Sequence, residues 1–148
     1  MRGLVALVVM TSCWRGNAPA PTPPVETKRA SAPSGPLAVE LVARPLQLTM
    51  AERDKFVIGF KVTNRSDAVI DPKLDVADLL INGEPSVMWA NTHGNGGREP
   101  EWYELPPGQH VARDYTIGTT LFEKPGDYTL VLKVSDILSA PVQIHVRP

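Results

Sequence analysis

The sequence predicts an all-β protein: an antiparallel β-sandwich of about seven or eight strands after a signal segment and a disordered proline-rich linker. Three observations lead to this prediction. Several short segments alternate apolar and polar side chains, which is the period of a half-buried strand. Turn residues separate these segments at intervals of roughly 8 to 12 residues. No long stretch sustains the 3.6-residue period of an amphipathic helix.

The chain of 148 residues has the composition of one ordinary globular domain, with proline as the main departure. Its formal net charge is -1 at pH 7, and its lysines and arginines form no cluster with interleaved aromatic residues. Nucleic acid is therefore not an expected partner. Six of the fifteen prolines lie within residues 17–36, which separates a short head segment from the rest of the chain.

Residues 1–12 are predicted to be a signal peptide. Arg2 supplies a positive charge, an uncharged apolar stretch follows over residues 3–10, and two small residues come next. The apolar run is shorter than the roughly 20 residues that cross a bilayer. Met10-Thr11-Ser12-Cys13 resembles a bacterial lipobox, which implies lipidation of Cys13. Two alternatives remain: a plain cleaved signal, or a buried strand with an ordinary core cysteine.

Residues 13–36 are expected to comprise the lipidated Cys13 and a disordered linker, because they contain too little apolar surface to fold. A proline-rich spacer of this length reaches at most roughly 60 Å. The predicted location is the bacterial cell envelope, lipid-anchored at the outer membrane or facing the periplasm. Without lipidation, the protein would be secreted or periplasmic. The domain over 37–148 has no cysteine and must rely on its hydrophobic core.

The first two segments of this domain read as strands. Within residues 37–49 the apolar residues change parity at Pro45, a residue that sheets tolerate at edges and bulges. We therefore expect a kinked edge strand whose two halves pair with different sheets. The second strand is predicted over residues 54–64 because its apolar side chains share one face. These side chains are Phe56, Ile58, Phe60 and Val62.

The middle of the chain allows two interpretations. Asn82-Gly83 is a strong signal for a two-residue hairpin turn, which favours a strand that starts at Leu79. Alternatively, Asp71 could cap a helix that begins at Pro72 and ends at Gly83. We favour the strand, with at most one helical turn before it over residues 72–78.

Three further strands are predicted over residues 110–117, 126–136 and 140–146, each with alternating apolar side chains. Arg113 interrupts the first of these patterns. We expect Arg113 to lie near a sheet edge or beside a carboxylate, because an unpaired buried arginine would be costly.

The segment LFEKPGDYTLVL resembles the late strands of bacterial immunoglobulin-like domains. The landmarks FKVTNRSD, LPPGQ and KPGDYTLVLKV also occur in an order similar to that of the intracellular proteinase inhibitor (BsuPI-like) domains. The resemblance spans about residues 56 to 134. It implies an immunoglobulin-like sandwich and, as a possible activity, inhibition of a protease by an exposed loop around residues 91–104.

The sequence predicts no enzymatic activity. The three histidines lack zinc-site spacing, and the chain contains no Gly-x-Ser-x-Gly motif. Asp71, Asp75 and Asp78 lack the arrangement of a calcium loop. Glutamates 99, 101 and 104 lie within one short loop, which holds catalytic geometry poorly. We therefore expect no catalytic residue, no metal and no cofactor.

Residues 89–108 are long for a hairpin connection, and long loops in compact domains are often functional. We interpret four residues there as a candidate binding loop, because aromatic rings with arginine are typical anchors. These residues are His93, Arg98, Trp102 and Tyr103. The alternative interpretation places Trp89 and Trp102 in the core.

We expect a membrane-anchored extracytoplasmic interaction module that binds another envelope protein, and no small-molecule ligand. The alternatives are a protease inhibitor acting through residues 91–104, a structural accessory domain of an envelope complex, and a hydrolase without a recognised motif.

Overall fold

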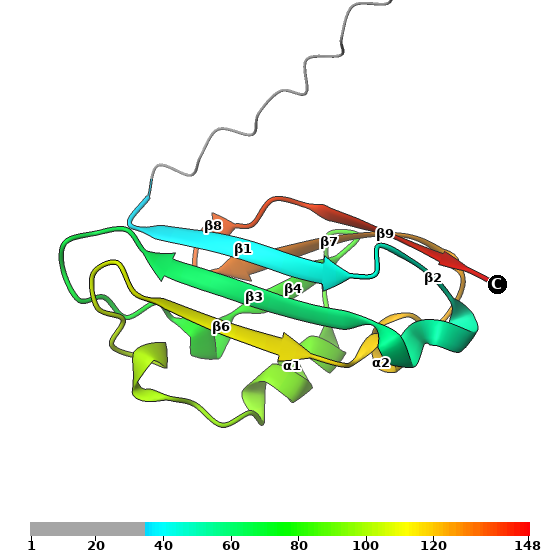
Figure 1. Ribbon diagram of the computed structural model, residues 1–148, viewed down its shortest axis with the longest axis horizontal. Coiled ribbons are helices and arrows are strands. Elements are labelled where there is room, and N and C mark those ends of the chain that lie inside the picture. Colours follow the sequence, from blue (N-terminus) through cyan, green and yellow to red (C-terminus); the bar gives the residue numbers. More distant parts are fainter. Residues whose placement is uncertain (1–34) are drawn as a thin grey trace, which may run out of the picture.

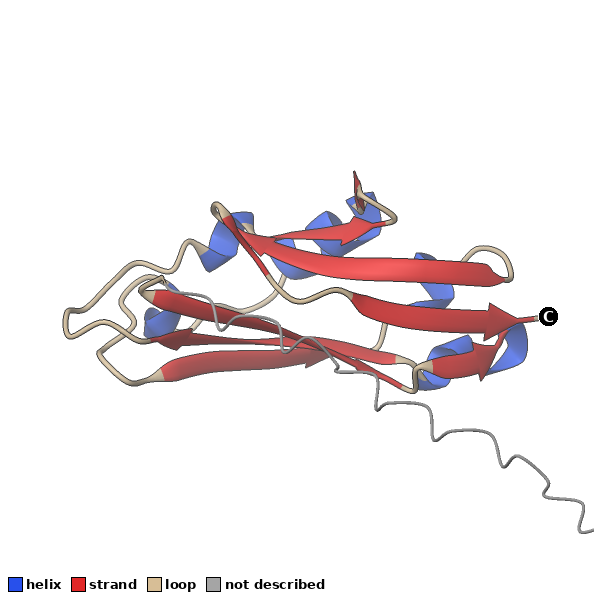
Figure 2. Cartoon of the chain, turned by 90° about the horizontal axis from the view of Figure 1, so that it is seen from above, coloured by secondary structure: helices blue, strands red, loops and turns tan. Residues whose placement is uncertain are grey.

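The computed structural model describes residues 35–148, which form two β-sheets packed against each other (Figure 1, Figure 2). This part of the chain is mostly β, with a few short helices, in agreement with the expected class. The predicted signal peptide over 1–12, Cys13 and the linker as far as residue 34 lie outside the described residues.

One sheet has three antiparallel strands in the order β1-β3-β6, and the other has the order β2-β9-β7-β4-β5 with β8 beside β7. The first sheet consists of β1 (Leu37–Arg44), β3 (Val57–Asn64) and β6 (His110–Tyr115). The second consists of β2 (Gln47–Thr49), β4 (Asp78–Ile81), β5 (Glu84–Pro85), β7 (Gly126–Val134), β8 (Ile137–Leu138) and β9 (Val142–Arg147). The helical elements are η1 (Met50–Lys55), η2 (Leu74–Val76), α1 (Val87–Gly94), η3 (Pro100–Trp102) and α2 (Gly118–Leu121).

The kinked first strand predicted at Pro45 is confirmed. Before Pro45 the chain forms β1 in one sheet, and after it the chain forms β2 in the other. The purely antiparallel pairing predicted for the domain is wrong at this point, because β2 pairs with β9 in parallel. The nine strands of residues 35–148 also exceed the predicted seven or eight. The count is higher because it includes β5 and β8, which have only two residues each.

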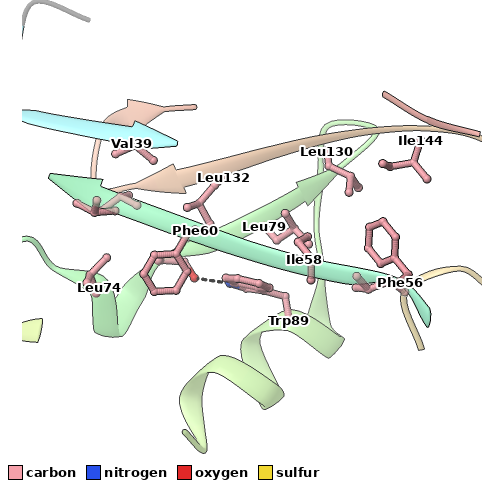
Figure 3. Packing of buried hydrophobic residues seen from close by; sticks show 14 of the residues in the cluster. Val39, Phe56, Ile58, Phe60, Leu74, Leu79, Trp89, Leu130, Leu132 and Ile144 are labelled. Atoms are coloured by element: carbon pink, nitrogen blue, oxygen red, sulfur yellow. Dashed lines mark hydrogen bonds between the residues drawn. The ribbon is translucent and has the colours of Figure 1, made fainter. Parts of the chain in front are cut away.

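The alternating segments supply the core between the two sheets (Figure 3). The apolar side chains of β3 and of the residue before it are at most 2% exposed, and those on the matching face of β7 are at most 9% exposed. The residues on these two faces are Phe56, Ile58, Phe60, Val62, Tyr128, Leu130, Leu132 and Val134. Burial of each large apolar side chain stabilises the fold by about 1.5–3 kcal/mol.

The favoured interpretation of the middle segment is also confirmed. One helical turn, η2, precedes β4, and β4 turns back into β5. Asn82 and Gly83 both have positive φ, 52° and 90°, as a tight hairpin turn of the primed type requires. The alternative helix over residues 71–83 is absent from the described structure.

Residues 86–104 form an ordered crossing between the two sheets instead of the expected long loop. α1 packs beside β4, η2 and α2, and η3 packs beside β6, the last strand of the three-stranded sheet. Ser86 caps α1 by accepting a hydrogen bond from the Trp89 amide over 3.2 Å. The crossing fills the space between the sheets on the side of β6 and places Trp89, His93 and Trp102 in the core.

Candidate functional site

Two of the four predicted binding residues, His93 and Trp102, are buried, with 2% and 0% of their surface exposed. Their interpretation as exposed anchors is therefore corrected. Aromatic rings surround the His93 imidazole: it stacks on Trp89 with ring centroids 5.1 Å apart and lies 5.0 Å from Trp102. Burial of these large rings removes apolar surface from water, which stabilises the fold more than their exposure in a loop would.

Both ring nitrogens of His93 have partners. Nε2 lies 2.5 Å from the carbonyl oxygen of Leu74, which can only accept, so we assign the ring proton to Nε2. Nδ1 then accepts from the Tyr115 hydroxyl over 3.0 Å. His93 thus connects α1 to η2 and to β6 as a neutral ring. Burial lowers the pKa of His93 below its ordinary value of 6.5, and the charges of Arg98 and Arg113 act in the same direction.

This lowered pKa predicts a loss of stability in mild acid. Below about pH 6.5 the unfolded chain protonates His93 while the folded chain does not, so the free energy of unfolding falls as pH decreases. Above that pH the contribution of His93 is fully present. Urea unfolding between about pH 8 and pH 5 should show a steeper decline for the wild type than for His93→Gln. Equal slopes in the two proteins would contradict the buried neutral ring.

The other two predicted residues, Arg98 and Tyr103, lie on the surface. The Arg98 Nη1 donates to the Tyr103 hydroxyl over 3.1 Å, and Tyr103 is 43% exposed. The exposed part of the predicted loop is therefore shorter than residues 91–104, because α1 occupies its beginning and Trp102 is buried near its end.

Arg113 fixes this exposed part against β6. Its guanidinium lies over the Trp102 ring, 5.2 Å from the centroid, and donates to the Gly97 carbonyl and to Glu99 Oε1, each over 2.6 Å. The expectation that Arg113 lies at a sheet edge or beside a carboxylate is confirmed on both counts, since β6 is an edge strand.

A groove of about 580 Å³ lies beside β6. Its lining comes from the segment around η3, from the turn that follows, and from the first half of β6. The residues are Glu99, Glu101, Pro106, Gln109, His110, Val111 and Ala112. Sequence reasoning noted the glutamates but missed the groove, because residues 99 and 112 become neighbours only when the turn over residues 105–109 folds back.

Asn64 positions that turn from inside the protein. Its buried amide Nδ2 donates to the Leu105 carbonyl over 2.8 Å and to the Ala68 carbonyl over 2.7 Å, while Oδ1 accepts from the Ser66 amide and hydroxyl. The amide of Gly108 donates to the Asn64 carbonyl over 3.0 Å. These bonds hold the entry into β6 beside the end of β3.

The outer edge of β6 carries backbone groups that do not bond to β3. The Asn64 amide donates to the Gln109 carbonyl over 2.9 Å, so this pair is hydrogen-bonded in the β3–β6 register. Hydrogen-bonded pairs alternate along an antiparallel ladder. The N–H and C=O groups of His110, Ala112 and Asp114 therefore point away from β3, and the first two of these residues line the groove.

The described residues contain no group of three or more His, Cys, Asp or Glu side chains arranged to hold a metal ion. Asp71, one of the aspartates considered for calcium, instead pairs with Lys73 over 2.6 Å. Hydrogen bonds from Lys73 lower the pKa of the Asp71 carboxyl. Within residues 35–148, no helix is long and apolar enough to span a membrane.

Comparison of the chain with protein-family models and with curated proteins gives no match. The resemblance to BsuPI-like domains stays a prediction from the sequence landmarks.

Proposed function

We propose that this chain is a membrane-anchored extracytoplasmic binding module without catalytic activity, which contacts another envelope protein along the edge of β6. The observation that carries the proposal is the groove at this edge, where backbone donors and acceptors face outward beside two carboxylates. Edge strands with free backbone groups readily accept a further strand. Arg113 holds the segment around Glu99, which forms the wall of the groove facing β6, so the groove is formed before a partner arrives.

We also propose that the domain is an immunoglobulin-like sandwich. In that architecture two antiparallel sheets enclose the core, and variable-type domains carry an additional strand beside the third strand of the fold. With β1 and β2 counted as the two halves of one kinked first strand, β4 is this third strand. The strand orders β1-β3-β6 and β2-β9-β7-β4-β5 support this proposal. So does β5, the two-residue strand that pairs with β4 at the end of the second sheet.

Attachment to the membrane is proposed to depend on Cys13. The full-length chain with Cys13→Ser should move from the membrane fraction to the soluble fraction of bacterial cells, because the acyl chains that anchor it are missing. Fractionation followed by immunoblotting measures this shift. Replacement of Ser12 by alanine, another small residue, should leave the protein in the membrane fraction. A wild-type chain found mainly in the soluble fraction would refute the anchor.

Binding at the β6 edge is testable by site-specific photocrosslinking in cells. A photoreactive residue in place of Gln109, which lines the groove, should give a discrete product with one envelope protein. The control position is Lys133, which is exposed on β7. Crosslinks from Lys133 equal to those from Gln109, or none from Gln109, would contradict the proposed surface.

A further inference from the structure

We propose that the segment bound at the β6 edge is an extended, basic peptide of the partner protein, which pairs with the backbone of residues 110–112 and places a lysine or arginine against Glu101. This inference rests on the function proposed above and adds the chemistry of the partner. Three features carry it: the spacing of the free backbone groups, the charge of the groove wall and the position of Arg113.

The backbone of β6 selects an extended chain. His110 and Ala112, which line the groove, each direct one N–H and one C=O away from β3. These groups lie two residues apart, which is the repeat at which a paired strand offers its own groups. Val111 lies between His110 and Ala112; its backbone N–H and C=O face β3, and its side chain is buried, with 6% exposed. A helix satisfies its own backbone and could not use these groups.

The groove wall selects positive charge. The lining contains two carboxylates, Glu99 and Glu101, and, among the described residues, no lysine or arginine. Glu99 already pairs with Arg113 over 2.6 Å. Glu101 is exposed and has no ion pair or hydrogen bond within residues 35–148, so it offers a carboxylate to an incoming cation. An acidic or phosphorylated segment would meet the unpaired, like-charged carboxylate of Glu101 there.

Arg113 sets the length of the open edge. Its bonds to Gly97 and Glu99 hold residues 97–99 against β6 at Arg113. The open edge beside the groove therefore runs from residue 110 to residue 112, because both backbone groups of Gln109 are already bonded, to Asn64 and to Pro106. A few residues of extended chain, with alternate side chains facing the glutamates, match this length.

The test uses the full-length chain and three short dye-labelled probes measured by fluorescence anisotropy. The probes are the blocked peptides (Lys-Val)3 and (Glu-Val)3, and (Lys-Val)3 with its internal amides N-methylated. We expect (Lys-Val)3 to bind at least about tenfold more tightly than either of the others. The proposal would be overturned if (Glu-Val)3 bound as tightly as (Lys-Val)3. It would also be overturned if the N-methylated peptide bound as tightly as unmodified (Lys-Val)3.

Two variants locate the binding. Ala112→Pro removes an outward N–H without breaking a β3–β6 hydrogen bond, and should weaken (Lys-Val)3 at least about tenfold. Ala112→Val keeps the amide and should bind like the wild type. Glu101→Gln should weaken binding about threefold and reduce its dependence on salt. If Ala112→Pro does not fold, as judged by circular dichroism, the N-methylated peptide and Glu101→Gln still decide the question.

The remaining outcomes separate this inference from the function on which it rests. A Gln109 crosslink to an envelope protein together with no binding of (Lys-Val)3 would refute the basic peptide and keep the binding module. Loss of both signals would refute the proposed function itself. A chain that elutes as a dimer, and as a monomer with Ala112→Pro, would assign the edge to a second copy and overturn the basic peptide.

Discussion

Replacement of Trp89 by alanine should lower the free energy of unfolding by about 3–5 kcal/mol, the range for removal of a fully buried large aromatic side chain. Trp89 is 0% exposed, stacks on His93 and meets Phe60 edge to face with ring centroids 6.4 Å apart. The change would leave a cavity between α1 and the sheets. Urea unfolding, followed by circular dichroism, measures the loss.

A matched pair of milder changes tests why Trp89 matters. Trp89 Nε1 donates to the buried Ala77 carbonyl over 2.9 Å, the hydrogen bond drawn from Trp89 in Figure 3. Trp102 Nε1, in contrast, has no partner among the described residues. Trp89→Phe leaves a buried carbonyl unpaired, at an additional cost of about 1–3 kcal/mol. Trp102→Phe breaks no hydrogen bond. Equal losses from the two phenylalanine variants would contradict these assignments.

Replacement of Gly118 by alanine should destabilise the fold by about 1–3 kcal/mol or more. A Cβ at Gly118, the first residue of α2, would lie 2.3 Å from the Arg53 carbonyl oxygen and 2.6 Å from the Phe56 Cβ. Both of those atoms belong to or adjoin the backbone, so neither can move aside without shifting η1 or β3. The thermal midpoint and urea unfolding of the purified variant measure the effect.

Gly97 provides the control for Gly118. A Cβ at Gly97 would meet nothing within 4 Å, and Gly97→Ala should therefore leave the free energy of unfolding within about 0.5 kcal/mol of the wild type. If the two alanine variants were equally stable, α2 would not pack against η1 as closely as the structure shows.

The strands were predictable because their information is local. In β3 and β7 the two-residue alternation marks the buried face directly, and at Pro45 the change of parity marks the passage from one sheet to the other. Asn82 and Gly83 specify the hairpin through backbone conformations that few other residues adopt.

The crossing over residues 86–104 was not predictable in the same way. In α1 the apolar Val87 is 71% exposed while the polar His93 is 2% exposed, so hydrophobicity does not reveal which side faces the core. His93 becomes a core residue only because Leu74 and Tyr115, distant in sequence, satisfy its two nitrogens.

The groove depends on still longer connections. Its floor is β6, its wall is the segment around Glu99, and the two are joined by Arg113. The sequence indicated that Arg113 needs a carboxylate or an edge but could not say which of several nearby glutamates it would take. Which backbone groups of β6 stay free depends on the register with β3, and this register is a property of the assembled sheet.

Hydrogen exchange at single amides of β6 tests the central claim most directly. In the full-length chain, the amides of Val111 and Arg113 should be protected by β3, whereas the Ala112 amide should exchange rapidly and become protected when (Lys-Val)3 is added. An Ala112 amide that is protected as strongly as Val111 in the free chain would show that the edge of β6 is already occupied, and would contradict the account.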